Sequence, residues 1–304
     1  MRLAIIDLGT NTFNLLIVET LNEQDYTVLF ENKLPVKLGK GGIHNKFILP
    51  DAMKRAETAL DDHYRNITKL KVERIHAFGT SALRGAKNSN EFLHQMKIKF
   101  NINIQLIDGD KEAELIYKGV RQTLELGSPS SLILDIGGGS NEFIICNAEQ
   151  IFWKQSFNLG IARLLEEFSP SDPVTNEELD LINAHFEKEL QPLFHIASQY
   201  KIKQLIGASG TFDTLISMID LNNKMENTIA HSQKIEMHDF YNLYNKLLPS
   251  SHEQRSKMAG LEPMRIEMIV LAIHFVKFVI EKLQIKHLFQ SDFSLKEGAV
   301  SDVL

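Results

Sequence analysis

The chain is poor in several features that would assign it to a familiar class of protein. Cys146 is its single cysteine among 304 residues, so no disulfide can form within the chain and a reducing, cytoplasmic location is expected. The longest apolar run, Ile269–Ile273, is far too short to span a bilayer, and we expect no membrane association. Asp7 interrupts the N-terminus before an apolar segment of secretory length, which argues against a signal peptide.

Several metal, nucleotide and nucleic-acid features are also missing. No GxxxxGK[ST] segment occurs, which excludes a P-loop ATPase, and the lack of an HxxxH or HExxH pair argues against a zinc site. With 33 basic and 39 acidic residues the net charge is −6, which argues against a general binder of nucleic acid or membrane surfaces. A polyanionic substrate stays open, because it needs only a locally positive cleft.

The length and the order of the predicted elements indicate two α/β domains. A chain of 304 residues exceeds what one core usually holds. In each half, three strands are followed by alternating helices and strands, which predicts a mixed sheet flanked by helices. The strands are predicted at 5–7, 13–20, 26–34, 72–78, 102–107, 131–135, 142–146, 150–158, 204–207 and 287–290. The main helices are predicted at 50–69, 89–100, 110–126, 160–168, 175–198, 237–248, 264–282 and 295–303.

The stretch Leu132–Cys146, LILDIGGGSNEFIIC, carries the strongest chemical pattern. It predicts a strand, a tight glycine turn and a second strand. Consecutive glycines let backbone N–H groups converge on a phosphate, and the flanking Asp135 and Glu142 suit a hard cation. A glycine hairpin with a purely structural role has the same pattern, so this stretch alone does not decide between the two.

The N-terminal stretch Ala4–Val18 repeats this pattern. Self-similarity at a large offset indicates a duplicated unit and therefore two related domains. If the two turns face each other across a cleft, a phosphoryl-transfer site is favoured over two structural hairpins. Position by position, the first stretch aligns Asp7 with Asp135, Gly9 with Gly137, Thr12 with Ser140, and Asn14 with Glu142.

A helix breaker, Gly127-Ser128-Pro129, marks the expected domain boundary. We predict an N-terminal lobe over residues 1–127 and a C-terminal lobe over residues 128–304. The closing helix, predicted at 295–303, could pack back on the first lobe.

Seven segments in a fixed order resemble the exopolyphosphatase/guanosine-pentaphosphate phosphohydrolase (Ppx/GppA) family, which belongs to the actin, hexokinase and chaperone ATPase superfamily. The resemblance implies two ribonuclease-H-like, actin-like ATPase lobes, in the short two-domain form of the family. The segments are DLGTNTF, TSALR, DGDKEAELIYKGV, DIGGGSNE, ASGT, GLEPMRIEMI and SLKEG.

The resemblance also implies a reaction, the Mg²⁺-dependent release of terminal phosphate from inorganic polyphosphate or guanosine pentaphosphate. It makes Glu112, in Asp110-Lys111-Glu112-Ala113, the catalytic base. The family usually has a second Glu where this chain has Lys111. That lysine could lower the pKa of Glu112, contact a substrate phosphate, or simply face solvent. The sequence does not choose between the two substrates.

Each candidate site residue has a role and a structural alternative. Asp7, Asp135 and Glu142 are the expected metal-side acids, and Arg84 is the expected cationic phosphate clamp. The alternatives are structural turns, a solvated acid at a helix start, and a surface arginine. The full set expected to bind phosphate is Thr10, Asn11, Thr12, Arg84, Gly137, Gly138, Gly139, Ser140, Asn141, Ser209, Gly210 and Thr211.

Other functions and partners stay open at this point. A sensor that binds polyphosphate or the alarmone without turnover is one alternative, and an ATP-dependent kinase of the same superfamily is another. The basic loop Lys37–Gly42 either steers polyanions or is merely solvated. The apolar helix predicted at 264–282 serves either a homodimer interface or the core.

Overall fold

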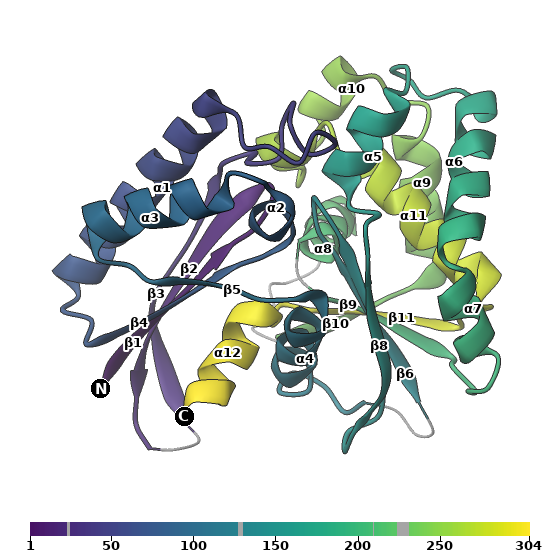
Figure 1. Ribbon diagram of the computed structural model, residues 1–304. Coiled ribbons are helices and arrows are strands. Elements are labelled where there is room, and N and C mark those ends of the chain that lie inside the picture. Colours follow the sequence, from purple (N-terminus) through teal and green to yellow (C-terminus); the bar gives the residue numbers. More distant parts are fainter. Residues whose placement is uncertain (23–24, 127–129, 209, 224–230) are drawn as a thin grey trace.

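The structure, a computed structural model, describes residues 1–22, 25–126, 130–208, 210–223 and 231–304. Its strands form two mixed sheets, one in each half of the chain (Figure 1). The first sheet has the order β3-β2-β1-β4-β5, and β4 and β5 extend the antiparallel meander β1–β3 with parallel pairs. Its strands are β1 Arg2–Leu8, β2 Thr12–Thr20, β3 Tyr26–Pro35, β4 Arg74–Gly79 and β5 Ile104–Leu106.

The second sheet repeats this plan and adds one strand, in the order β10-β11-β9-β6-β7-β8. Its meander β6–β8 is again antiparallel, and β9 and β11 follow in parallel. The predicted fold class, two mixed sheets flanked by helices, is therefore confirmed, although the edge strand β10 was not predicted. The strands are β6 Ser131–Ile136, β7 Asn141–Cys146, β8 Ile151–Phe157, β9 Gln204–Ala208, β10 Ser232–Ile235 and β11 His287–Ser291.

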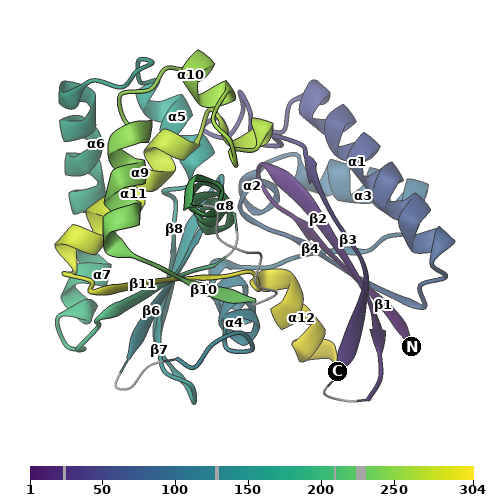
Figure 2. The same cartoon turned by 180° about the vertical axis from the view of Figure 1, so that it is seen from behind.

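Helices cover the outer faces of both sheets (Figures 1 and 2). This burial on both faces explains why the inner strands are nearly continuous apolar runs. On the first lobe lie α1 Pro50–Lys69, α2 Ser81–Gly85 and α3 Ser89–Phe100. On the second lie α5 Ile161–Phe168, α6 Asn176–Glu189, α7 Gln191–Ala197, α8 Thr211–Asn223, α9 Met237–Leu247, α10 His252–Ser256 and α11 Ile269–Lys282.

Two further helices, α4 Gly109–Val120 and α12 Leu295–Val303, lie between the sheets (Figure 1). They contact each other, and α4 also packs on β7 and β8 while α12 packs on β1 and β2. The crossing is tight, because a Cβ on Gly298 would lie 1.8 Å from the Leu115 carbonyl oxygen. Each helix therefore packs on the sheet of the opposite lobe and connects the two lobes. The predicted boundary at residues 127–129 lies outside the described residues and stays a prediction.

Three predicted helices have different bounds in the structure. The segment 175–198 is two helices that meet at Leu190, because Pro192 lacks the N–H that a continuous helix needs. The helix predicted at 264–282 begins only at Ile269, after the 3-10 turn η1 Pro263–Arg265. The helix predicted at 110–126 ends at Val120.

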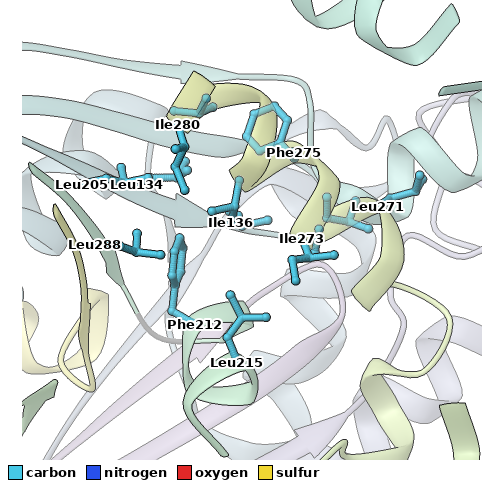
Figure 3. Packing of buried hydrophobic residues seen from close by; sticks show 14 of the residues in the cluster. Leu134, Ile136, Leu205, Phe212, Leu215, Leu271, Ile273, Phe275, Ile280 and Leu288 are labelled. Carbon is cyan, nitrogen blue, oxygen red and sulfur yellow. The ribbon is translucent and has the colours of Figure 1, made fainter. Parts of the chain in front are cut away.

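The apolar helix α11 lies in the core of the second lobe. Every residue from Ile269 to Val276 is buried. Figure 3 shows Ile273 and Phe275 of this helix packed among Leu134 of β6 and Phe212 of α8. Core burial therefore accounts for its composition, and it offers no exposed apolar face for a dimer. No helix within the described ranges is long and apolar enough to cross a membrane.

Candidate active site

The two sequence-related hairpins close with the same turn. The Gly9 N–H donates to the Thr12 carbonyl oxygen at 3.0 Å, and the Gly137 N–H donates to the Ser140 carbonyl oxygen at 3.0 Å. Glycine is required at both first positions, since a Cβ there would lie 2.8 Å and 2.6 Å from the same carbonyl oxygens. The predicted duplication thus extends to the backbone of the turns.

These turns meet across the lobes. A Cβ on Gly138 would lie 2.8 Å from the Asn11 side chain, and one on Gly139 would lie 2.6 Å from the hydroxyls of Thr10 and Ser81. Only a residue without a side chain allows the second turn to approach the first this closely. The GGG sequence is therefore needed for lobe contact as well as for the turn.

A polar cavity of about 460 Å³ lies at this junction. Its lining includes both turns and acids from both lobes. Of the predicted site residues, those lining it are Asp7, Thr10, Asn11, Thr12, Glu112, Asp135, Gly137, Gly138, Gly139, Ser140, Glu142 and Gly210.

The acids of the cavity are desolvated and repel one another. Burial raises the pKa of Asp7 and of Asp135 to about 6, and the charge on Asp7 adds to the rise at Asp135. Burial, followed by the charge of Asp135, raises the pKa of Glu142 to about 7. The pKa of Glu112 is raised well above its ordinary value by burial first and by Glu142 second. The cavity therefore concentrates negative charge that a cation or a proton would stabilise.

Hydrogen bonds fix three of these carboxylates. Asn14 Nδ2 donates to Asp7 at 2.8 Å, and Ser294 Oγ at the start of α12 donates to Asp135 at 2.7 Å. Ser156 Oγ donates to Glu142 at 2.6 Å. In register, Asn14 opposes Asp7 just as Glu142 opposes Asp135.

Glu112 lies in the first turn of α4, which Asp108 caps by accepting from the Lys111 N–H at 2.8 Å. Its side chain is buried, and Arg84 Nη1 lies 3.0 Å from its Oε2. The same nitrogen of Arg84 donates to the Ile107 carbonyl oxygen at 2.8 Å. The structure thus pairs Arg84 with Glu112. Arg84 is not among the residues that line the described cavity. Its role as a direct phosphate clamp stays a prediction.

Lys111 points away from the cavity. Its Nζ lies 2.9 Å from Asp302 on α12 and 3.4 Å from Glu114. The lysine that replaces the usual family glutamate therefore joins α4 to α12. Of the three roles that the sequence left open for Lys111, these ion pairs do not favour a contact with substrate phosphate.

The remaining predicted residues fall in three places. Asn141 is buried and its Nδ2 donates to the Leu159 carbonyl oxygen at 2.9 Å, which is a structural contact. Thr211 lines a small adjoining cavity with Arg265 and Met268. Ser209 lies outside the described residues.

Arg265 is a cavity residue that sequence reasoning missed. It is 9% exposed, and within the described residues neither its Nε nor the buried Thr10 Oγ1 has a hydrogen-bond partner. Its guanidinium lies 3.1 Å from where a Cβ on Gly210 would be. Its position in GLEPMRIEMI, which is part of the family resemblance, could have drawn attention to it. Two buried donors without partners in one acidic cavity fit an anionic ligand.

The oxygen donors of the cavity fit Mg²⁺ only in part. Within the described ranges, no group of three or more His, Cys, Asp or Glu side chains is arranged to hold a metal ion. Asp7, Asp135 and Glu142 nevertheless line one cavity, where the charge of Asp7 raises the pKa of Asp135 and the charge of Asp135 raises the pKa of Glu142. Mg²⁺ keeps several waters and takes few protein carboxylates. The set therefore fits an ion shared between one or two carboxylates, waters and a bound phosphate.

The loop Lys37–Gly42 is docked on the second lobe. Lys37 Nζ lies 2.6 Å from Glu267, and the Gly41 N–H donates to Glu166 on α5. Leu38 of the loop is buried in the core of the first lobe. The loop thus contacts the opposite lobe, which is neither of the two roles considered for it from sequence.

Known proteins share this architecture. A family model described as the Ppx/GppA phosphatase family matches residues 16–304. The crystal structure of an exopolyphosphatase from Cytophaga hutchinsonii superposes with a TM-score of 0.96 at 36% identity, over 100% of this chain and 99% of that one. Exopolyphosphatase 2 of Mycobacterium tuberculosis is 25% identical over 98% of this chain and 97% of its own length. A guanosine-5'-triphosphate,3'-diphosphate pyrophosphatase of Aliivibrio fischeri is 28% identical over 97% of this chain but only 58% of its own length.

Proposed function

Because this chain belongs to the Ppx/GppA phosphatase family, we propose that it hydrolyses a terminal phosphoanhydride bond of inorganic polyphosphate or guanosine pentaphosphate. Its two mixed sheets form the two-lobed, actin-like ATPase fold of that family. The observation that carries the proposal is the cavity where two glycine turns, the buried Glu112 and the unpartnered donors of Arg265 and Thr10 come together.

In this mechanism the terminal phosphate lies against the two turns. Backbone N–H groups, the Thr10 hydroxyl and the Arg265 guanidinium would donate to its oxygens and neutralise part of its charge. Water attacks phosphorus opposite the bridging oxygen. The new P–O bond forms as the bridging P–O bond breaks, and the shortened chain leaves with the electron pair.

Glu112 accepts the proton of the attacking water. Burial raises the pKa of Glu112 well above its ordinary value, which increases the affinity of this carboxylate for the proton it accepts. Arg84, 3.0 Å from Glu112, holds the carboxylate in place and limits the rise of its pKa. Without Arg84, the pKa of Glu112 would rise further.

One or two of the carboxylates of Asp7, Asp135 and Glu142 would hold Mg²⁺, together with waters and the substrate. The ion would neutralise charge on the transferred phosphate when bound. The ion pair of Lys111 with Asp302 gives no support to a sensor that binds without turnover, and we therefore propose hydrolysis.

The test is a phosphate-release assay with Mg²⁺ on long polyphosphate, short polyphosphate, guanosine pentaphosphate and ATP. We expect release from at least one of the first three and little from ATP. Relatives named for one or the other of these activities match nearly the whole of this chain in sequence, so this comparison also decides which substrate is preferred. Phosphorylation of an acceptor at the expense of ATP would contradict the proposal.

A further inference from the structure

Arg265 reaches the cavity from a long connection between α9 and α11. This connection contains α10 and the 3-10 turn η1, with Gly260 between them at φ +81°. A Cβ on Gly260 would lie 2.6 Å from the Ser217 carbonyl oxygen, so the connection presses closely on α8. Arg265 thus lies at the end of the short turn η1, before the start of α11 at Ile269, and contacts from other segments help to hold its side chain in place.

The segment around Arg265 also contacts the first lobe. Glu267 pairs with Lys37 at 2.6 Å, and Asn11 of the first turn donates to the sulfur of Met268. Arg265 is therefore carried by a part of the second lobe that faces the first lobe directly. A shift of this segment would move Arg265 relative to both turns.

Arg255 on α10 holds the backbone of this segment through a hydrogen bond. It is 5% exposed, and its Nε donates to the carbonyl oxygen of Ile266, the residue that follows Arg265, at 3.0 Å. Its Nη2 donates to Asp172 Oδ1 at 2.7 Å and its Nη1 donates to the Ser250 carbonyl oxygen. Asp172 in turn accepts from the His252 N–H at 2.6 Å. One guanidinium thus joins both ends of the connection to a loop of the second lobe.

A lysine cannot replace this arrangement. Three acceptors lie around the planar guanidinium, on Ile266, Ser250 and Asp172, and each takes a different nitrogen. A single ammonium group on a flexible stem does not reach all three at once. The geometry calls for arginine even though Arg255 itself lies outside the described cavity lining.

We propose that Arg255 is a positioning residue for phosphate binding, because its guanidinium fixes the segment that carries Arg265 into the cleft. The inference rests on the proposed function for the identity of the ligand. Arg255 does not contact substrate, and it acts through the backbone at Ile266. Loss of Arg255 should therefore weaken phosphate binding while the proton transfer at Glu112 is largely kept.

The experiment measures calorimetric binding of inorganic triphosphate with Mg²⁺ to the full chain carrying Glu112→Gln, so that the ligand survives. Arg255→Met is expected to weaken binding by about tenfold or more, Arg255→Lys by less, and Arg265→Met by at least as much as Arg255→Met. The double variant Arg255→Met/Arg265→Met should bind no more weakly than Arg265→Met alone, because both changes remove one interaction.

Leu193→Ala, a truncation in the second-lobe core away from the cleft, is the control for simple loss of stability. It should lower the thermal midpoint without changing triphosphate affinity. Arg255→Lys and Asp172→Asn provide the same test if Arg255→Met does not fold. In the hydrolysing enzyme, Arg255→Met, Arg255→Lys and Asp172→Asn should each raise KM more than they lower kcat.

The inference is overturned if Arg255→Met or its substitutes bind triphosphate as the parent does. It is also overturned if the effects of Arg255→Met and Arg265→Met multiply. Failure of the proposed function has a different outcome, in which the wild-type chain binds triphosphate but releases no phosphate from any substrate.

Discussion

The β1–β2 hairpin of the first lobe and the β6–β7 hairpin of the second have the same backbone turn and different side chains. Asp7 faces the amide of Asn14, whereas Asp135 faces a second carboxylate, Glu142. The helices that follow the parallel strands β4 and β9 differ as well, since α2 carries Arg84 and α8 carries Asp213. The two hairpins thus share a turn geometry, while their different side chains make the second hairpin more acidic than the first.

This asymmetry separates the features that depend on the turn itself from those that depend on the residues on either side of it. The 3.0 Å closing bond is common to both lobes and depends on glycine. The paired acids exist only in the second lobe, so we assign cation binding chiefly to that side. Substitutions at matched positions of the two hairpins can therefore separate the two contributions.

The largest difference is expected between Glu142 and Asn14. Glu142→Gln should raise the Mg²⁺ concentration for half-maximal phosphate release by about 10- to 100-fold, because a carboxylate next to the ion is lost. Asn14→Ala, at the matched position of the first lobe, should change it by less than about threefold. Mg²⁺ titrations of both variants make the comparison, and equal effects would break the asymmetry.

A smaller effect is expected from Asp213, a half-buried acid of the cavity wall hydrogen-bonded to Gln290. Burial raises its pKa from 3.8 to about 6. A raised pKa in the folded state means that its contribution to stability is fully present below pH 4 and is lost as the pH rises through 6. Without Mg²⁺, stability should fall by up to about 3 kcal/mol over this window because of Asp213.

Asp213→Asn should flatten that part of the profile, as measured by chemical unfolding at pH 4, 5, 6 and 7. His274 has the opposite effect on the pH dependence of stability. Burial lowers its pKa to about 4, so protonation destabilises the fold as the pH falls from 6.5 to 4. The comparison is therefore between variant and wild type at each pH. An unchanged slope in Asp213→Asn would contradict the assignment.

The smallest expected effect concerns the turns themselves. Gly9→Ala and Gly137→Ala both bring a Cβ against a turn carbonyl and should each cost about 1–3 kcal/mol of unfolding free energy. Gly85→Ala is the matched control, because no atom lies within 4 Å of its added Cβ. Denaturant unfolding of the three variants tests whether the two turns are equivalent. A cost at only one of them would show that they are not.

The local parts of this structure could be predicted from sequence. The predicted bounds of α1, 50–69, are those of the structure, where Pro50 occupies the first turn, and the capping box of Thr175 and Glu178 places the start of α6 next to the predicted residue 175. The two turns followed from glycine and acid spacing. Such features depend on neighbours within a few residues, which a sequence pattern contains directly.

Features set by tertiary contacts could not be predicted. The strand β10 is a short, largely polar edge strand, recognisable only beside β11. The docking of Lys37 on Glu267 joins residues more than 200 positions apart. Arg265 enters the cleft from a motif that lacks the strand–glycine turn–strand pattern of the two hairpins, so only the family resemblance of GLEPMRIEMI pointed to it. The pairing of Arg84 with Glu112 likewise required the fold.

The most direct measurement is phosphate release by the wild-type chain and by Glu112→Gln, side by side, on polyphosphate and guanosine pentaphosphate with Mg²⁺. The account predicts release by the wild type and a loss of about 10²- to 10⁴-fold in kcat for the variant, with triphosphate binding and the thermal midpoint preserved. Full activity in Glu112→Gln would contradict the assignment of the base. Absence of release by the wild type on every substrate would contradict the function itself.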